Sequence, residues 1–287
     1  MHVLVTGGTG TVGSQVVREL LARNVEVSVL TRDASKGATL PPGVRAVVGD
    51  LGEAETVRRI FEDVDAVFLV TVVSPTEAHE GLMAVTGMRL AGTKRVVYLS
   101  VQDADTAAWL PHFGAKVGVE GALKVSGIPY TILRPNNFHQ NDYWFKDALV
   151  QYGVYPQPLG SLGASRVDVR DIAEAAAIAF TEPGHEGQTY DLVGPDLHTG
   201  ETTAQVWSRV LGKEIRYGGD DLEAWEKQFL QYMPEFMVFD FRQMYDFFQK
   251  QGFRGTPDTI AHQTKLLGHA PRSFEAFAEE TAAAWKG

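Results

Sequence analysis

The sequence contains no cysteine, which excludes disulfide bonds, thiolate metal sites and cysteine nucleophiles. Only histidine and carboxylate clusters remain as candidate metal ligands. The eight histidines are scattered, and they form neither a His-x-x-x-His nor a His-Glu-x-x-His pattern. We therefore expect no metal site.

The sequence has fewer basic than acidic residues. It contains 26 Lys and Arg and 36 Asp and Glu, which gives a formal net charge of -10. Such a surface repels the phosphates of nucleic acid, so we expect no nucleic-acid partner. No apolar run approaches the roughly 18 residues of a transmembrane helix. The opening residues MHVLVTGGTG lack the basic and apolar regions of a signal peptide. We therefore expect no membrane partner and a cytoplasmic location.

Short β-branched runs alternate with longer amphipathic stretches in the first half of the chain. With 287 residues, 44% of them hydrophobic, the chain suits one large α/β unit or two joined lobes. The runs cover residues 2 to 6, 25 to 30, 44 to 48, 65 to 70, 95 to 100 and 130 to 133. Strands this uniformly apolar are buried on both faces. The pattern predicts an α/β fold with a doubly wound parallel sheet and helices on both of its faces.

After Pro135 this rhythm ends. Helix-like stretches at 166 to 180 and 201 to 212 flank a strand at 189 to 194, and the residues from Asp221 onward look mostly helical. No Gly/Ser/Pro-rich spacer separates the halves. We expect a sheet domain over 1–135, to which the strands of about 165–195 return, and a smaller lobe over 136–287 that is mostly helical after 200.

The last third holds most of the aromatic residues. At helical spacings most of them should be core, while a roof over a planar ligand and an oligomer interface are the alternatives. The set is Trp225, Phe229, Tyr232, Phe236, Phe239, Phe241, Tyr245, Phe247 and Phe248.

A glycine-rich turn, TGGTGTVGS, directly follows the first strand, with Gly7, Gly10 and Gly13 in a G-x-x-G-x-x-G spacing. One glycine turns the chain, another lets backbone approach a pyrophosphate, and the third lets the helix pack on its strand. A tight strand–helix turn is the plain alternative, but this context indicates a dinucleotide over the helix N-terminus. The expected contacts are Gly7, Thr9, Gly10, Thr11, Val12 and Gly13.

The residues after the second strand, VLTRDASK, bear on which dinucleotide binds. Arg32 and Lys36 favour the 2′-phosphate of NADP(H), whereas Asp33 could serve the ribose of NAD(H) instead, which stays the alternative. Later strand ends add further expected cofactor contacts, namely Asp50, Leu51, Thr71 and Val72.

These stretches, with VVYLSV, GAKVGVEGALKVSGIPYTILRPNNF, VDVRDIAEAAAIAF and TYDLVGP, resemble the atypical short-chain dehydrogenase/reductase superfamily. Within it the chain is most similar to the NmrA-like branch, which includes triphenylmethane-dye and quinone reductases. The resemblance covers nearly the whole chain, is strongest over 1–195, and finds nothing specific after about 220. It implies a Rossmann-like NAD(P)-binding domain over 1–135 and a substrate-binding lobe over 136–287.

The resemblance also implies catalytic positions. In the superfamily a serine after the fifth strand and a Tyr-x-x-x-Lys pair transfer protons beside the nicotinamide, and the lysine holds the nicotinamide ribose. By position these are Ser100 and Lys116, but His112 stands where the tyrosine would be. His112 could donate a proton, since its ordinary pKa is near neutral, or it is a first-turn residue after Pro111 with no chemical role. Hydride addition to a conjugated acceptor can proceed without an acid.

The segment RPNNFHQNDYWF, Arg134 to Phe145, leads toward the substrate side in this family. The expected substrate contacts are Asn136, Phe138, His139, Tyr143 and Trp144, and Pro135 and Asn137 are expected at the cofactor. For Trp144 and Phe145, packing between the lobes is the alternative.

The sequence thus predicts an NADPH-dependent reductase of a conjugated aromatic or quinone-like small molecule, aromatic polyketides included. The main alternative is an NmrA-like regulator that senses the dinucleotide and acts through a protein partner. A third hypothesis is an epimerase or dehydratase that uses the nicotinamide transiently. The sequence is also compatible with a homodimer.

Overall fold

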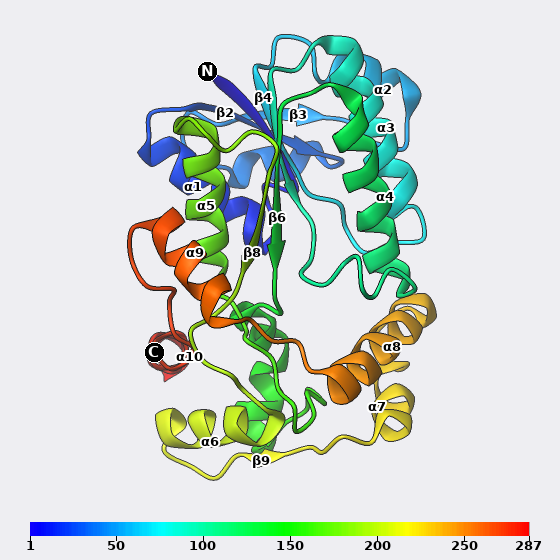
Figure 1. The fold of residues 1–287 in the computed structure, drawn as a ribbon. Helices are drawn as coiled ribbons and strands as arrows, with labels where there is room; N and C mark the ends of the chain where they lie inside the picture. Colours follow the sequence, from blue (N-terminus) through cyan, green and yellow to red (C-terminus); the bar gives the residue numbers. More distant parts are fainter. Residues whose placement is uncertain (287) are drawn as a thin grey trace. The chain divides into compact units, whose positions relative to one another are not determined.

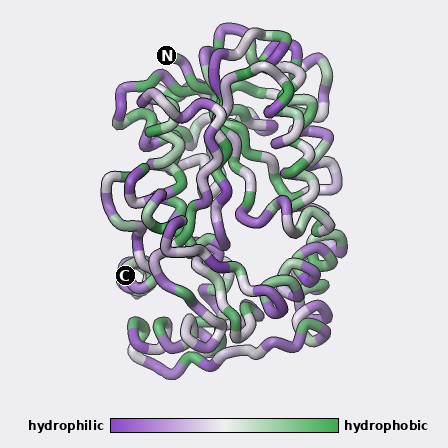
Figure 2. The backbone as a smooth tube through the Cα atoms, in the orientation of Figure 1, coloured by the Kyte–Doolittle hydropathy of each residue, from purple (hydrophilic) through white to green (hydrophobic). Residues whose placement is uncertain are grey.

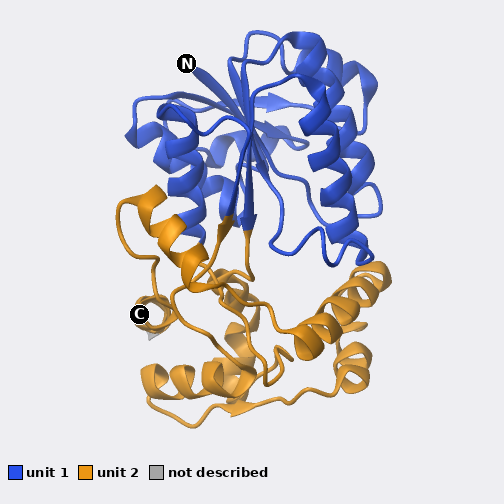
Figure 3. Ribbon diagram, in the orientation of Figure 1, with its two compact units in different colours: residues 1–134, 169–190 blue, residues 135–168, 191–287 orange. Residues whose placement is uncertain are grey.

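A computed structural model describes residues 1–286 as two compact units. Unit 1 comprises Met1–Arg134 and Val169–Tyr190, and unit 2 comprises Pro135–Asp168 and the chain from Asp191 onward (Figure 3). The chain therefore leaves the first unit after the sixth strand and returns to it for one helix and most of one further strand.

A seven-stranded sheet with the order β3-β2-β1-β4-β5-β6-β8 forms the centre of unit 1 (Figure 1). The strands are β1 (His2–Thr6), β2 (Glu26–Thr31), β3 (Arg45–Val48), β4 (Ala66–Leu69), β5 (Arg95–Leu99), β6 (Tyr130–Pro135) and β8 (Gln188–Leu192). Neighbours from β3 to β6 are paired in parallel. This order is that of a Rossmann-like sheet, which confirms the predicted fold class.

The strands at the two edges of the sheet depart from the expectation of full burial. β1 and β4 are buried along their whole length, but Arg45 and Val48 of β3 are exposed, as is most of β8. An apolar run such as VRAVV does not reveal whether a strand will be central or at an edge, because that depends on how many strands follow it.

Helices cover both faces of this sheet (Figure 1). α1 (Thr11–Ala22) packs against α5 (Val169–Thr181) on one face, and α2 (Ala54–Arg59), α3 (Glu77–Ala91) and α4 (Pro111–Ser126) lie together on the other. Figure 2 shows hydrophobic residues along these strands and the helices that cover them. The core below α3 and α4 contains Leu4, Val67, Met88, Val96, Tyr98, Val119 and Leu123.

Unit 2 is mainly helical, as the sequence predicts. Its helices are α6 (Gly200–Leu211), α7 (Leu222–Phe229), α8 (Glu235–Gln251), α9 (Pro257–Leu267) and α10 (Phe274–Lys286), beside a small parallel pair of β7 (Val154–Tyr155) and β9 (Arg216–Tyr217). Short helical turns occupy His139–Phe145 and Ala148–Tyr152. Within residues 1–286, no helix combines the length and apolarity needed to cross a membrane.

The aromatic residues of α7 and α8 are less buried than the sequence suggests. Trp225, Tyr245 and Phe248 are buried, and Trp225 packs edge-on against Tyr245 with ring centroids 5.1 Å apart. Phe239 of α8, in contrast, is 54% exposed, and Tyr232, in the turn between α7 and α8, is 74% exposed. The expectation that most of this set would be core is therefore wrong. Aromatic residues occur on more than one face of α8, and only one face is covered.

Candidate functional site

The glycine turn between β1 and α1 has the geometry that its spacing predicts. Gly7 has a φ of +61°, in the left-handed region that favours glycine, and a Cβ there would lie 2.6 Å from Val70 Cγ1. Gly13 lies in the first turn of α1, where a Cβ would clash with the carbonyl of Gly7. Gly7 therefore makes the turn, and Gly13 lets the helix start directly against it.

The N-terminus of α1 is suited to an anion. Gly10 is the N-cap residue, its N–H donates to the Gly7 carbonyl at 2.9 Å, and no described side chain caps the helix. The first turn contains no acidic residue that would repel a phosphate. Because first-turn amides have no acceptor within the helix, they and the positive end of the helix dipole can bind a pyrophosphate.

Of the charged side chains after β2, two are exposed cations and one is a carboxylate that caps a short helix. Arg32 and Lys36 are exposed, whereas Asp33 caps the short helix Ala34–Thr39 by accepting hydrogen bonds from the Ser35 amide at 2.8 Å and its hydroxyl at 2.7 Å. These bonds from Ser35 lower the pKa of Asp33. Asp33 is thus engaged in a local helix cap, whereas the side chains of Arg32 and Lys36 are exposed.

Other expected cofactor residues lie at the carboxyl ends of β3 and β4. Asp50 accepts a hydrogen bond from the Gly52 amide at 2.8 Å, and the adjacent Leu51 is buried. Thr71 is buried, whereas Val72 is exposed. Carboxyl ends of parallel strands share one edge of the sheet, so these residues lie along the same edge as the glycine turn.

Lys116 and Thr71 converge on a carboxylate that the sequence did not single out. Glu77 begins α3 and is almost fully buried. Its Oε1 accepts hydrogen bonds from Lys116 Nζ at 2.9 Å and from Thr71 Oγ1 at 2.8 Å. Gly81 permits this arrangement, since a Cβ there would clash with Val119 of α4. The close approach of α3 and α4 thus brings the lysine and the glutamate together.

Ser100, which follows β5, is bound to a second buried carboxylate. Its Oγ donates to Glu120 Oε1 at 2.6 Å, and Glu120 also accepts two hydrogen bonds from Arg134, at 2.9 and 2.7 Å. Burial raises the pKa of Glu120, but the bonds from Arg134 and Ser100 outweigh it and lower the pKa overall. The single hydroxyl proton of Ser100 is therefore directed at a carboxylate.

α4 places the three polar positions of this region on one stripe. His112, Lys116 and Glu120 are four residues apart, and all three are buried. The His112 ring packs edge-on against Phe113 with centroids 4.7 Å apart, in the turn that Pro111 begins. The structure thus brings His112 and Lys116 to one face of the helix, as the Tyr-x-x-x-Lys spacing requires.

The expected substrate residues of unit 2 do not share one environment. Asn136 is buried and donates from its amide to the Phe253 carbonyl at 2.7 Å. His139 is fully enclosed, with Nε2 bonded to the Arg166 carbonyl at 2.9 Å, and burial lowers its pKa. His139 thus lies in the interior of unit 2, where its ring packs against Phe274 and Phe277. Among the other expected residues, Pro135 is buried, Phe138 is half-buried, and Tyr143 and Trp144 are exposed.

A buried arginine organises this segment. The Arg166 guanidinium is paired with Asp142, with Nη2 2.6 Å from Oδ1 and Nη1 3.2 Å from Oδ2. It also donates to Asn137 Oδ1 at 3.1 Å and to the Phe138 carbonyl at 2.9 Å. Trp207 Nε1 completes the set by donating to Asp142 at 2.8 Å. The orientation of Asn137, an expected cofactor residue, is therefore set by Arg166.

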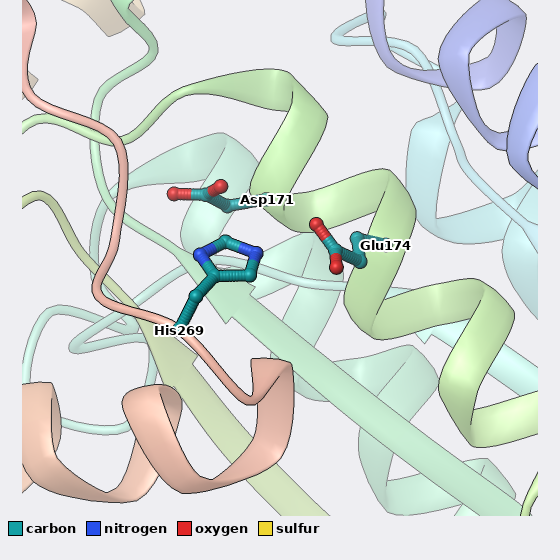
Figure 4. A group of neighbouring side chains, drawn as sticks. All are labelled: Asp171, Glu174 and His269. Atoms are coloured by element: carbon teal, nitrogen blue, oxygen red, sulfur yellow. The ribbon is translucent and has the colours of Figure 1, made fainter.

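Figure 4 shows Asp171 and Glu174, which lie about one turn apart on α5 in unit 1, and His269, which follows α9 in unit 2. Asp171 lies in the first turn of α5, where the positive end of the helix dipole stabilises a carboxylate.

The model of the NmrA-like family matches residues 1–278. The chain belongs to the NmrA-like family. The NAD(P)H azoreductase of Xenophilus azovorans is 33% identical to it over 286 residues, which are 99% of each chain. The triphenylmethane reductase of Citrobacter sp., solved with NADP(H), is 26% identical, with a TM-score of 0.84 over 98% of this chain and 100% of that one. The NADPH-dependent quinone oxidoreductase of Escherichia coli, solved with NADPH, shares the fold at 23% identity, with a TM-score of 0.86 over 99% and 100% of the two chains.

For this NmrA-like protein the predicted family and Rossmann-like fold are confirmed. Sequence reasoning missed Glu77, Glu120 and Arg166. A glutamate after Ser-Pro-Thr looks like any first-turn acid, and a glutamate four residues after Lys116 looks like an ordinary helix pair. Arg166 gave a weak signal, as a cation next to small and apolar residues in the stretch GASRV.

Proposed function

We propose that this NmrA-like protein is an NADP(H)-dependent oxidoreductase that transfers hydride to a conjugated aromatic, azo or quinone-like small molecule. The arrangement on α4 carries the proposal. Histidine occupies the tyrosine position, and the hydroxyl of Ser100 is committed to Glu120 at 2.6 Å. The chain therefore lacks the hydroxyl that related dehydrogenases use as an acid, which suits an acceptor that needs none.

The residues of unit 1 fit the dinucleotide. Gly7 and Gly13 leave the space that a Cβ would fill, and Gly10 leaves the N-terminus of α1 open to a pyrophosphate. In this proposal Arg32 and Lys36 bind the 2′-phosphate, and Lys116 binds the nicotinamide ribose. When bound, the reduced nicotinamide supplies the hydride.

The remaining contribution of the chain is binding and orientation. A conjugated acceptor spreads the charge that arrives with the hydride, so positioning alone can supply several kcal/mol of the rate enhancement. An isolated ketone concentrates that charge on one oxygen and needs an acid beside it. The named activities of the azoreductase and the dye reductase support this choice of acceptor.

The test is NADPH oxidation, followed by absorbance, with an azo dye, a triphenylmethane dye, a quinone, an aromatic polyketide and an unconjugated ketone. We expect turnover on one or more of the conjugated acceptors and none on the ketone. Turnover on the ketone alone would contradict the proposed chemistry. Tight NADPH binding without turnover on any acceptor, together with capture of a protein partner, would favour the regulator instead.

A further inference from the structure

Lys116 enters the interior of unit 1 as one half of an ion pair. Its side chain is 10% exposed and that of Glu77 is 1% exposed, with 2.9 Å between Nζ and Oε1. Removing two charges from water is costly, and the pair is tolerated because each charge compensates the other. Thr71 strengthens the arrangement by donating to the same oxygen at 2.8 Å.

The fold holds the carboxylate in place from several directions. Glu77 lies in the first turn of α3, where the helix dipole favours a negative charge. Gly81, one turn later, lets α4 approach through Val119, which is itself about one turn beyond Lys116. Within residues 1–286, Glu77 Oε2 makes no hydrogen bond, and Glu77 forms its ion pair with Lys116 through Oε1.

We propose that Glu77 is a positioning residue that holds the Lys116 ammonium and cancels its charge, so that the nicotinamide end of the cofactor meets a neutral pair. This inference rests on the proposed function, because it takes Lys116 as the residue beside the nicotinamide ribose. It goes beyond that function in assigning the charge balance of the site to a residue on a different helix.

The net charge of the Lys116–Glu77 pair can be measured through its effect on cofactor binding. The nicotinamide ring carries a positive charge when oxidised and is neutral when reduced. A bare lysine nearby would repel the oxidised form, a bare glutamate would attract it, and a neutral pair treats the two forms alike. The ratio of the dissociation constants of NADP+ and NADPH therefore reports the net charge that the pair presents.

The experiment measures both dissociation constants by titration calorimetry on the full chain. For Glu77→Gln we expect the ratio of the NADP+ constant to the NADPH constant to rise, on the order of tenfold. For Lys116→Met we expect it to fall. The double variant Glu77→Gln/Lys116→Met buries no unpaired charge, so it keeps the test valid should either single variant fold poorly, and its ratio should return toward the wild-type value.

Asp65→Asn is the matched control. It changes the net charge by the same amount as Glu77→Gln but acts on a surface pair with Lys94, before the amino end of β4. Its ratio should equal that of the wild type. If Glu77→Gln weakens the binding of NADP+ and of NADPH by the same factor, Glu77 has only a structural role. This outcome would overturn the inference and leave the proposed function untouched. Absence of NADPH binding by the wild-type chain would overturn the proposed function, and the inference with it.

Discussion

The hydroxyl of Ser100 lies 2.6 Å from the carboxylate of Glu120, and this bond links the end of β5 to the middle of α4. Glu120 in turn receives the guanidinium of Arg134 from β6. A serine at this position is a proton-transfer residue in related dehydrogenases. Here it is part of a buried ionic network, so its contribution to the chemistry would require that network to open.

Replacing Gly13 with alanine should abolish dinucleotide binding. The new Cβ would clash with the backbone carbonyl of Gly7, which cannot move without distorting the turn itself. Titration with NADPH measures the loss. Gly118→Ala is the control, because a Cβ at this exposed position in α4 meets nothing within 4 Å. The control should keep binding and gain up to about 1 kcal/mol of stability, as alanine favours helix. Unchanged binding by Gly13→Ala would contradict the assignment of the turn.

Removing the Arg32 side chain should weaken NADPH more than NADH. The guanidinium offers paired donors to a phosphate that NADH lacks, and such charge-assisted contacts contribute about 1.5–3 kcal/mol, or roughly tenfold to a hundredfold in affinity. Dissociation constants for both cofactors test this. Arg45→Ala removes the same charge from the exposed start of β3 and should leave the preference unchanged. Equal losses of both cofactors in Arg32→Ala would argue against the phosphate contact.

Phenylalanine in place of His112 should leave kcat on a conjugated acceptor within a few-fold of the wild type. The ring is buried against Phe113, so an aromatic replacement preserves packing while removing both nitrogens. A side chain that acts as an acid contributes about 100-fold to 10,000-fold. A fall of that size in kcat, with an unchanged KM for the acceptor, would identify His112 as the donor.

The ion pair of Asp65 with Lys94 should make stability depend on pH in a defined window. The hydrogen bond from Lys94, with one from the His2 amide, lowers the pKa of Asp65 to about 2. Because the folded pKa lies below the unfolded one, the contribution is complete above about pH 4 and is lost as pH falls toward 2. Asp65→Asn should therefore be less stable than the wild type at pH 7, with the difference shrinking through this window. Urea unfolding at several pH values measures it, and a difference independent of pH would refute the assignment.

The fold was predictable because its signals are local. Uniformly apolar runs, amphipathic stretches between them and the glycine spacing at Gly7, Gly10 and Gly13 each occupy a few consecutive residues. The exposure of β3 was not predictable in this way, since a strand becomes an edge through the positions of the others. The exposed aromatic Phe239 follows the same rule, because helical spacing does not tell which faces of α8 will be covered. Tyr232 lies in the turn between α7 and α8, where a helical spacing does not apply.

The candidate site was predictable only in part, because its electrostatic partners are distant in the chain. The positions of Lys116 and Ser100 follow from spacing, but Glu77 is 39 residues before Lys116 and its approach depends on the packing of two helices. Asp142 and Arg166 are 24 residues apart and meet inside unit 2. Ion pairs of this kind are formed by tertiary packing, and no regular spacing in a single sequence indicates them.

Two buried ionic contacts hold α4 in position, and together they restrict how this helix can move. Lys116 ties the helix to its neighbour α3, and Glu120, one turn later, ties it to the loop after β5 and to β6. A slide or rotation by one residue would separate opposite charges from their buried partners at both points at once. The backbone amides around Lys116 and Glu120 should therefore exchange with deuterium only when much of unit 1 unfolds. Their exchange should be slower than that of amides at the ends of the helices.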